Sequence, residues 1–540
     1  MPASPFHRAP RSTLLVAFAL LAIVHTWPLA RHPSTLSRLD TADASLNTWA
    51  IAWVSHTLPR DPGHLFNAPI FYPSPLAFAY SEPLIIQGVM AMPVLAAGGS
   101  PVLAYNLVLL AGFTLTAWTI ALLVLRATAS LPAALVAGSA GAFNAHNLMR
   151  LPHLQALHLE FLPLALMALD RLLADARLRH ALLLAGAVVL QGLASIYALA
   201  FTGWALLSAV VAWPRVRSGR TCKTLGLLVL AMLLTMIALA PVLYPYYVVS
   251  HTLGLVRTVG EALVFSSTWT DYLYTGGTFH FDAWSHRFAG SSDANFPGIT
   301  VMLLAGIAVA RGWDGNRHVR MAAGIVIGAV LLSVLPRLPG FEWIHDHVPV
   351  LGAIRGYSRA GQIALVGLAI LAGLGLAELE TRLRGYRSWA LVAGGALLLV
   401  NVEALRAPLT YVPFTGISEV YATLGGPANG PMLELPIFGP TSEHRNAPYM
   451  VSATTHWRPM VNGYSGFLPP GYGDIYDTLR VFPDAASIAW LQSHHVTTVV
   501  LHRAEFERWK GAAQRERVES CPALELTTIS GDIRVFRVRP

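Results

Sequence analysis

The feature that most constrains this chain is a series of apolar runs, each long enough to cross a membrane. Residues 101–125, 224–248 and 361–381 exceed the roughly 18 apolar residues that suffice for one helical crossing. Of the 540 residues, 54% are hydrophobic and only 12% are charged, whereas soluble domains carry about 25% charged residues. We therefore expect a polytopic α-helical membrane protein.

Lys and Arg are distributed unevenly over the polar segments between these runs. Six short tracts contain sixteen of them in 53 residues: 1–11, 126–130, 170–180, 214–223, 311–320 and 382–387. The other segments contain eight in 146 residues: 32–100, 149–153, 249–295 and 336–360. Because cytoplasmic loops carry an excess of Lys and Arg, the first group is predicted to be cytoplasmic and the second external.

This assignment predicts eleven membrane helices, with the N-terminus in the cytoplasm and the C-terminus outside. The predicted helices are residues 12–31, 101–125, 131–148, 154–173, 180–197, 198–213, 224–248, 296–310, 320–336, 361–381 and 388–406. Residues 84–98 are also apolar, but they contain Pro93 and are too short for a full crossing, which is typical of interfacial or re-entrant segments. We therefore place them in a long first external loop, residues 32–100.

Two general features have other interpretations. The basic residues 1–11 before an apolar run are also typical of a signal peptide, but no small-x-small cleavage site follows, which favours a retained helix. The net charge of +8 lies in short loops, which indicates membrane orientation and not nucleic-acid binding. The two cysteines, Cys222 and Cys521, lie on opposite predicted sides, so we expect neither a disulfide nor a metal site from them.

The polar residues 407–540, which follow a membrane domain over residues 12–406, are predicted to form a small external α/β domain. Residues 431–437 and 497–502 are typical of strands, and residues 486–495 are typical of a helix. Residues 524–538 are predicted to form a hairpin with Gly531-Asp532 at its turn.

Two carboxylates lie in "RLDTADASLNTWAIAWVSH" (38–56), just after the first predicted membrane helix. Residues 44–57 have helical periodicity with Trp49 and Trp53 on one face, which indicates a helix in the membrane interface. Asp is a preferred residue at the start of a helix, so Asp40 and Asp43 are either helix caps or groups with a chemical role. One of them can cap while the other points into a cavity.

The chain has a first membrane helix, then acidic residues within a dozen positions, and then an external loop with an interfacial helix. This arrangement resembles the GT-C superfamily of integral-membrane glycosyltransferases. Further segments resemble bacterial GT-C-like proteins, many without an assigned substrate: residues 67–84, 104–110, 142–172, 354–379 and 462–472 ("NGYSGFLPPGY"). The resemblance covers roughly residues 10–410 and the last of these segments.

The resemblance implies transfer of a sugar from a polyprenyl-phosphate donor to a lipid or glycan acceptor at the outer leaflet of a bacterial inner membrane. It implies that a first-loop aspartate is the catalytic base. The usual Asp-Glu or Glu-Asp pair is absent, and the acids here are spaced D-x-x-D. We favour Asp43, because the similar proteins place their acid just before a run like Leu46-Asn47-Thr48-Trp49.

Such a transfer needs a carboxylate that accepts the acceptor's hydroxyl proton, and cations that hold the phosphate as its charge grows. Arg355 and Arg359 are candidates for the phosphate, because paired guanidinium donors suit it; alternatively, both anchor lipid headgroups. Arg150 and Arg287 are further candidates. No nucleotide loop is expected, no metal ligand set is evident, and a divalent metal remains open.

Several other polar residues fall on or near the external half. If residues 150–161 are helical, His153 and Glu160 share a face and either orient a substrate, bind a metal with a third ligand, or form a hydrogen-bonded pair. Tyr72 and Glu82 are candidate substrate-binding residues. Gln191 is expected to bond to a neighbouring helix, and Asp271 is either a second acid or a loop cap.

Two functions from other classes compete with the enzyme. A transporter or flippase of lipid-linked sugars would place ionisable groups near the membrane midplane and show repeats, whereas most acids here are external and no repeat is visible. A non-catalytic GT-C-like assembly factor for cell-surface polysaccharide is the other alternative.

Overall fold

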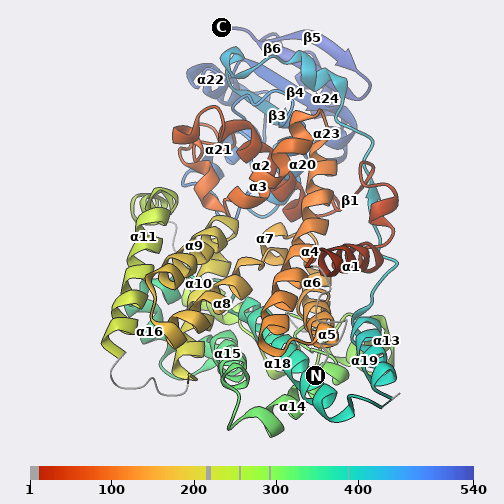
Figure 1. Ribbon diagram of the computed structural model, residues 1–540. Coiled ribbons are helices and arrows are strands. Elements are labelled where there is room, and N and C mark those ends of the chain that lie inside the picture. The colour runs from red at the N-terminus through yellow and green to blue at the C-terminus, as the bar shows by residue number, and fades with distance from the viewer. Residues whose placement is uncertain (1–10, 214–220, 255–256, 291–292, 387) are drawn as a thin grey trace. The chain divides into compact units, whose positions relative to one another are not determined.

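The computed structural model describes residues 11–213, 221–254, 257–290, 293–386 and 388–540 (Figure 1). The chain divides into two compact units. Unit 1 comprises Met1–His32, Leu107–Pro241 and Val256–Thr410, and unit 2 comprises Pro33–Asn106, Val242–Leu255 and Tyr411–Pro540. The first external loop and the polar tail of the sequence analysis thus belong to the same unit.

Unit 1 is built from helices. They are α1 (Arg11–His25), α4 (Pro101–Thr128), α5 (Leu131–Ala142), α6 (Ala145–Met149), α7 (Leu154–Leu157), α8 (Phe161–Asp175), α9 (Leu178–Ala194), α10 (Ile196–Val211), α11 (Thr221–Thr252), α12 (Val259–Val264), α13 (Thr278–Ala283), α14 (Ile299–Gly312), α15 (Arg317–Val334), α16 (Phe341–His347), α17 (Pro349–Gly352), α18 (Gly361–Leu383) and α19 (Ser388–Ala404). Helices α4 and α11 also contribute residues to unit 2.

Four helical segments are long and apolar enough to cross a membrane: Pro101–Thr128, Thr221–Thr252, Arg317–Arg337 and Tyr357–Leu383. Six further apolar helices are shorter, α1 and α19 among them. Each of the eleven predicted membrane segments overlaps a helix of the structure. The chain is therefore a helical membrane protein, while the number of crossings stays a prediction.

Helix α18 forms the centre of unit 1, where it packs against α5, α14 and α15. In its most apolar window, 89% of the residues are buried. Small residues allow this close packing: a Cβ atom on Gly373 would lie 2.9 Å from the carbonyl oxygen of Ala133. Helix α11 is the opposite case, because only 17% of its window is buried. Its exposed apolar side chains suit contact with lipid.

Unit 2 combines helices with a small sheet. Its elements are α2 (Ala42–Thr57), α3 (Ile85–Ala96), α20 (Ala447–Ala453), α21 (Tyr472–Leu479), α22 (Ala485–Ser493), α23 (Arg503–Lys510), α24 (Ala512–Glu519), β1 (Leu36–Ser37), β2 (Val412–Pro413), β3 (Met432–Leu435), β4 (Thr498–His502), β5 (Leu524–Ser530) and β6 (Ile533–Val538). Strands β1 and β2 form an antiparallel pair, and α2 packs against α3 and α20.

The four-stranded sheet confirms the predicted C-terminal α/β domain. Its strand order is β3-β4-β6-β5, with β3 parallel to β4 and the other two pairs antiparallel. Helix α22 leads into β4, as predicted, and β5 and β6 form the predicted hairpin. Gly531 takes φ 53° at its turn, a left-handed conformation that glycine adopts without steric cost. Figure 1 shows α22 and α24 beside the sheet.

For residues 44–57, the predicted helix is present, but the predicted exposure of its tryptophans to the membrane interface is wrong. Helix α2 is present, but Trp49 and Trp53 are only 1% and 8% exposed. They stack on each other with ring centres 6.5 Å apart, inside unit 2. Periodicity detects the apolar face of a helix but not whether protein or lipid covers it. Helix α3, within the run 84–98 that was placed in the first external loop, spans about 18 Å at 1.5 Å per residue, less than the hydrocarbon core of a bilayer.

Candidate active site

Asp43 lies in the first turn of α2, half-buried in unit 2. The helix is capped by Thr41, whose side-chain oxygen accepts a hydrogen bond from the backbone N–H of Ala44 at 3.3 Å. The capping function considered for Asp40 and Asp43 is therefore fulfilled by another residue. The Asp43 carboxylate instead accepts a hydrogen bond of 3.0 Å from the hydroxyl of Tyr464. Tyr464 belongs to the "NGYSGFLPPGY" segment that the sequence analysis had singled out.

Asp40 has a different environment from Asp43. Its carboxylate forms an ion pair with Arg38, with donor–acceptor distances of 3.0 and 3.3 Å, and its side chain is 39% exposed. The same arginine acts on Tyr411, where burial raises the pKa of the hydroxyl and the positive charge of Arg38 opposes the change. Asp40 is thus held in a surface ion pair, whereas the Asp43 carboxylate is held by the hydroxyl of Tyr464.

Tyr72 lines a cavity of about 540 Å³ in unit 2. Part of its lining is aromatic: Trp457 lies 5.4 Å from Trp53 and stacks on His56 at 4.9 Å, measured between ring centres. The Tyr72 hydroxyl donates to the carbonyl oxygen of His494 at 3.3 Å. Arg60 is also part of the lining. Aromatic faces beside polar side chains are the combination that sugar rings require.

Glu82 is half-buried in unit 2, outside the residues that line this cavity. Its negative charge acts on the hydroxyl of Tyr246, which donates a hydrogen bond of 2.7 Å to the carbonyl oxygen of Ser81. Glu82 therefore lies beside the C-terminal end of α11.

The two candidate phosphate-binding arginines lie together in unit 1, next to Tyr197. The guanidinium carbon of Arg359 is 5.2 Å from the centre of the Tyr197 ring, and that of Arg355 is 4.4 Å from the Phe265 ring. The backbone N–H of Arg355 donates to the Tyr197 hydroxyl at 3.3 Å. Stacking on aromatic faces holds a guanidinium group while its N–H groups stay directed outward.

Arg257 extends this cluster, and the sequence analysis did not select it. Burial and the neighbouring positive charge of Arg355 lower the pKa of Arg257, against the effect of Tyr197 and Glu261. Glu261 pairs with Arg257 at 3.3 Å. Within the described ranges, the guanidinium group of Arg355 has no carboxylate partner. The cluster is therefore rich in positive charge.

Arg150, one of the two further candidate cations, and the loop acid Asp271 have structural partners in unit 1. Arg150 forms an ion pair with Asp293, and His146 lies 3.6 Å from the same carboxylate. Burial by itself would raise the pKa of Asp293, but Arg150 and His146 outweigh it and lower this pKa. Asp271 is buried and accepts hydrogen bonds from the backbone N–H groups of Thr268 at 2.6 Å and Asp293 at 2.9 Å. Asp271 is thus a loop cap, one of its two predicted alternatives.

The predicted pairing of His153 with Glu160 is wrong. The segment is not one helix: α7 ends at Leu157 and α8 begins at Phe161, so the assumed helical spacing does not apply. The Glu160 carboxylate is bound by His158, at 2.9 Å from its Nδ1, and by the Thr116 hydroxyl at 3.4 Å. Gln191 donates to the carbonyl oxygen of His158 at 2.9 Å, which is the inter-helix bond expected of it.

The structure thus divides the candidate residues between the units. Asp40, Asp43, Tyr72 and Glu82 are in unit 2, whereas His153, Glu160, Arg355 and Arg359 are in unit 1. Among the described residues, no group of three or more His, Cys, Asp or Glu side chains is arranged to hold a metal ion. Tyr464 and His158 were missed. The only available signal was that Tyr464 lies in a resembling segment and that His158 is two residues from Glu160.

Comparison with known proteins identifies the fold. No protein-family model matches the chain, and no curated protein matches it in sequence. The structure of the arabinofuranosyltransferase AftD from Mycobacteria is similar with a TM-score of 0.62 and 14% identity, over 98% of this chain and 40% of AftD. ArnT from Cupriavidus metallidurans, bound to undecaprenyl phosphate, gives a TM-score of 0.48 and 12% identity over 97% of both chains.

The chain therefore spans about two fifths of the length of AftD. The similarity over nearly the whole of this chain shows that it has the fold of the GT-C membrane glycosyltransferases, as the resemblance in the sequence implied. At 14% identity the shared fold does not by itself assign an activity.

Proposed function

We propose that this protein is a membrane glycosyltransferase that moves a sugar from a polyprenyl-phosphate donor to an acceptor hydroxyl, with Asp43 as general base. The proposal rests on the fold shared with an arabinofuranosyltransferase and on the environment of one carboxylate.

The environment of Asp43 is the observation that carries the proposal. A general base must be ionised and held within hydrogen-bond reach of the proton it accepts. The first turn of a helix favours a negative charge, and Tyr464 fixes one carboxylate oxygen through a hydrogen bond of 3.0 Å. Asp40, only three residues away, is instead paired with Arg38. Of the two aspartates, Asp43 is therefore the one whose carboxylate is oriented by a neutral tyrosine hydroxyl at the start of a helix.

The proposed reaction is a single displacement with inversion at the sugar. The acceptor oxygen forms a bond to C1 of the donor sugar, and the bond between C1 and the phosphate oxygen breaks. The acceptor proton passes to Asp43, and polyprenyl phosphate leaves with the bonding electron pair. Negative charge therefore grows on the phosphate, and nearby cations stabilise it.

We assign the donor phosphate to the arginine cluster of unit 1, with Arg355 and Arg359 as its main members. Their stacking on aromatic rings supports this assignment, as does the lack of a carboxylate partner for Arg355 among the described residues. We assign sugar stacking to the aromatic cavity that Tyr72 lines. Glu160 receives no direct role, because His158 and Thr116 already bind its carboxylate. Glu82 and His153 are kept as proposed substrate-binding residues. The protein is proposed to lie in a bacterial cytoplasmic membrane, with its N-terminus inside and its C-terminal domain outside.

The test is sugar transfer in membranes containing the full chain, supplied with radiolabelled polyprenyl-phosphate sugars. Asp43→Asn keeps the shape of the side chain and removes the base, and general-base catalysis contributes roughly 10²–10⁴-fold. We expect Asp43→Asn to lower the rate by at least about 100-fold. Asp40→Asn is the matched control and should retain the rate within about threefold, because surface ion pairs contribute little.

Equal rates for both variants and the wild type would refute the role of Asp43. If the wild type transfers no sugar from any donor tested, the enzyme is excluded in favour of two alternatives: a transporter of lipid-linked sugars or a non-catalytic assembly factor. Measuring flipping of the same labelled donors in proteoliposomes then separates these two.

A further inference from the structure

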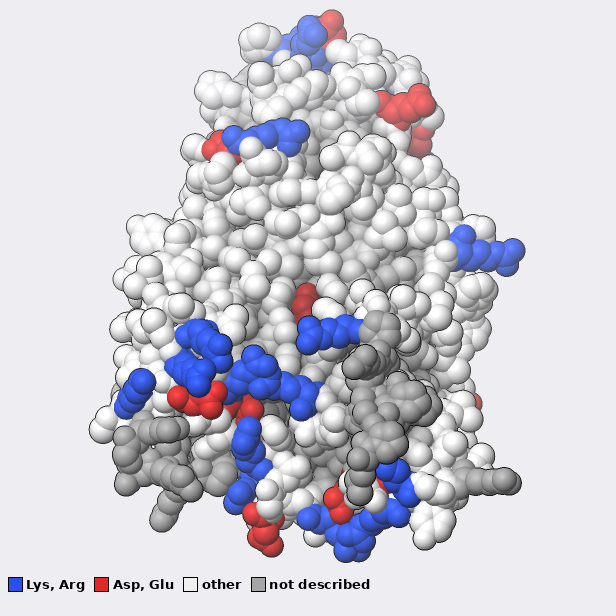
Figure 2. Space-filling view, viewed as in Figure 1, with Lys and Arg blue, Asp and Glu red and all other residues white. Residues whose placement is uncertain are grey.

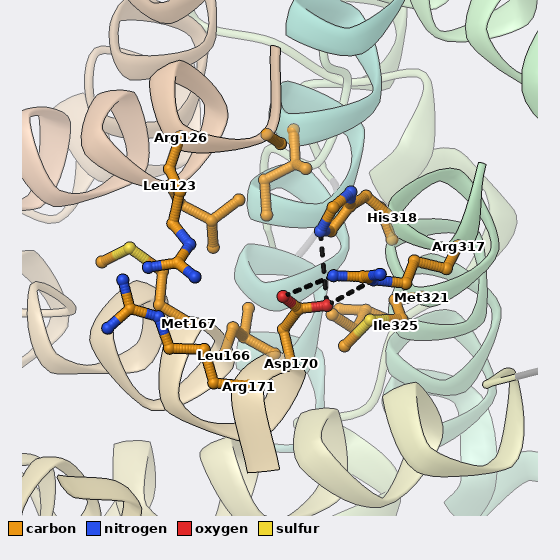
Figure 3. Close-up of a pocket in the computed structure, with 13 residues that line it drawn as sticks. Leu123, Arg126, Leu166, Met167, Asp170, Arg171, Arg317, His318, Met321 and Ile325 are labelled. Atoms are coloured by element: carbon orange, nitrogen blue, oxygen red, sulfur yellow. Dashed lines mark hydrogen bonds and ion pairs between the residues drawn. The ribbon is translucent and has the colours of Figure 1, made fainter. Parts of the chain in front are cut away.

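Unit 1 contains a second cavity, of about 270 Å³, between α4, α8, α15 and α18 (Figure 3). This volume corresponds to about nine water molecules and exceeds what a phosphate group alone would fill. Its rim is formed by four basic side chains: Arg126, Arg171, Arg317 and His318. None of them belongs to the arginine cluster beside Tyr197.

The charges at the rim do not cancel. Asp170 is the one acidic residue among those that line the cavity, and Arg317 and His318 occupy its carboxylate: Arg317 binds both oxygens at 2.8 and 3.2 Å, and His318 lies at 3.3 Å. Figure 3 shows this group on one side of the cavity and Arg126 and Arg171 on the other. Within the described part of the chain, neither Arg126 nor Arg171 forms an ion pair or a side-chain hydrogen bond. Two uncompensated guanidinium groups therefore border one small cavity.

The rest of the cavity lining is apolar, and we call it the floor. It is formed by side chains of four helices: Leu123, Leu166, Met167, Met321, Ile325 and Ile370. A soluble anion would gain nothing from such a floor, whereas an anionic headgroup that carries a hydrocarbon chain can use both the charges and the floor. The rim residues also come from the tracts 126–130, 170–180 and 311–320, which the distribution of Lys and Arg assigns to one side of the membrane.

On the face drawn in Figure 2, Lys and Arg side chains gather at the lower end, over helix ends of unit 1. Basic residues at a membrane surface attract anionic lipids in general, but only a cavity with fixed walls can select one. The cavity between the four helices is what distinguishes this site from the rest of the basic surface.

We propose that this cavity binds the phosphate headgroup of an anionic membrane lipid, between Arg126 and Arg171, with the first carbons of the lipid chain against the apolar floor. The site is separate from the residues assigned to sugar transfer, and it is predicted to open to the cytoplasmic leaflet.

The test measures lipid binding and does not depend on enzymatic activity. The purified full chain, in a zwitterionic detergent, is titrated with dioctanoyl phosphatidic acid, and bound lipid is counted by native mass spectrometry. A charge near the membrane surface changes anionic lipid binding by about fivefold. We expect Arg126→Gln and Arg171→Gln each to raise the dissociation constant about fivefold, and the double variant about 25-fold.

Arg311→Gln is the matched control. Arg311 is an exposed arginine at the end of α14, in the same predicted cytoplasmic group, and it does not line the cavity. It should change the dissociation constant less than twofold. Ala127→Phe places a ring on the cavity wall without changing any charge, and it should weaken binding as well. Arg126, Arg171, Arg311 and Ala127 are all exposed or half-exposed, so their variants are expected to fold.

Undecaprenyl phosphate and phosphatidic acid are compared as the two lipid sources of phosphate, and saturable binding of either supports the proposal. Three outcomes would overturn it: an equal loss of binding in Arg311→Gln, equally tight binding of dioctanoyl phosphatidylcholine, or displacement of the lipid by an equal concentration of inorganic phosphate. The first would indicate a non-selective basic surface, and the last a site for a soluble anion.

Discussion

The pair formed by His158 and Glu160 allows a stability prediction that needs no knowledge of the substrate. Both residues are buried, at 0% and 4% exposure. The Nε2 of His158 lies 3.2 Å from the carbonyl oxygen of Val108, and a carbonyl only accepts, so Nε2 must carry a proton. The Nδ1 atom faces Glu160 at 2.9 Å. The pair therefore shares one proton across this contact, as imidazolium with carboxylate or as imidazole with carboxylic acid.

Replacing Glu160 by leucine leaves the Nδ1 atom of His158 buried without a partner. An unpaired buried polar atom costs about 1–3 kcal/mol, and breaking a buried ion pair costs about 3–5 kcal/mol. The two ranges meet at ~3 kcal/mol, which is about a 150-fold change in the unfolding equilibrium. Glu160→Gln should cost less than ~1 kcal/mol, because its amide N–H can donate to Nδ1.

The assay is equilibrium unfolding of the purified protein in mixed dodecylmaltoside and dodecyl sulfate micelles, followed by tryptophan fluorescence. His153→Gln is the control, because His153 does not bind Glu160. The double variant His158→Leu with Glu160→Leu should lose less free energy of unfolding than the two single variants together, since neither member of the pair is then left without the other. Additive losses, or a Glu160→Leu effect no larger than that of His153→Gln, would refute the coupled pair.

Two further predictions concern packing and pH. A Cβ atom on Gly375 would overlap the carbonyl oxygen of Leu304, where α18 meets α14. Gly375→Ala should therefore lower the free energy of unfolding by ~1–3 kcal/mol. The control in the same unfolding assay is Gly394→Ala, because a Cβ atom on Gly394 meets no atom within 4 Å. In the C-terminal domain, burial would lower the pKa of His502, but Glu434 at 2.8 Å outweighs it and raises this pKa. A group whose pKa is higher in the folded than in the unfolded protein stabilises the folded domain. For His502 this stabilisation is fully present below the unfolded-state pKa of about 6.5, and it is lost as the pH rises through the folded-state pKa. Hydrogen exchange of β4, corrected for intrinsic rates, should therefore speed up between pH 6 and pH 8 in the wild type and change less in His502→Gln; an equal change in both would contradict this.

The sequence by itself determined the features that depend on composition along the chain. Apolar runs located the helices of the membrane domain, because a run long enough to cross a bilayer has to satisfy its backbone hydrogen bonds as a helix. Local turn chemistry determined the hairpin at Gly531-Asp532, and strand-like runs located β3 and β4. The order of these features resembles that of the GT-C superfamily, and the structure shares its fold with AftD.

Only the tertiary structure decided the partners of the candidate residues. Tyr464 binds Asp43 across 421 positions of the chain, and no periodicity relates residues so far apart. The same limit explains the error at Glu160: a break of the helix between Leu157 and Phe161 replaced His153 by His158 as its partner. Side chains in a folded protein bind what packing brings near, and packing depends on contacts distant in sequence, whereas patterns along the chain report only the nearest turns of a helix or strand.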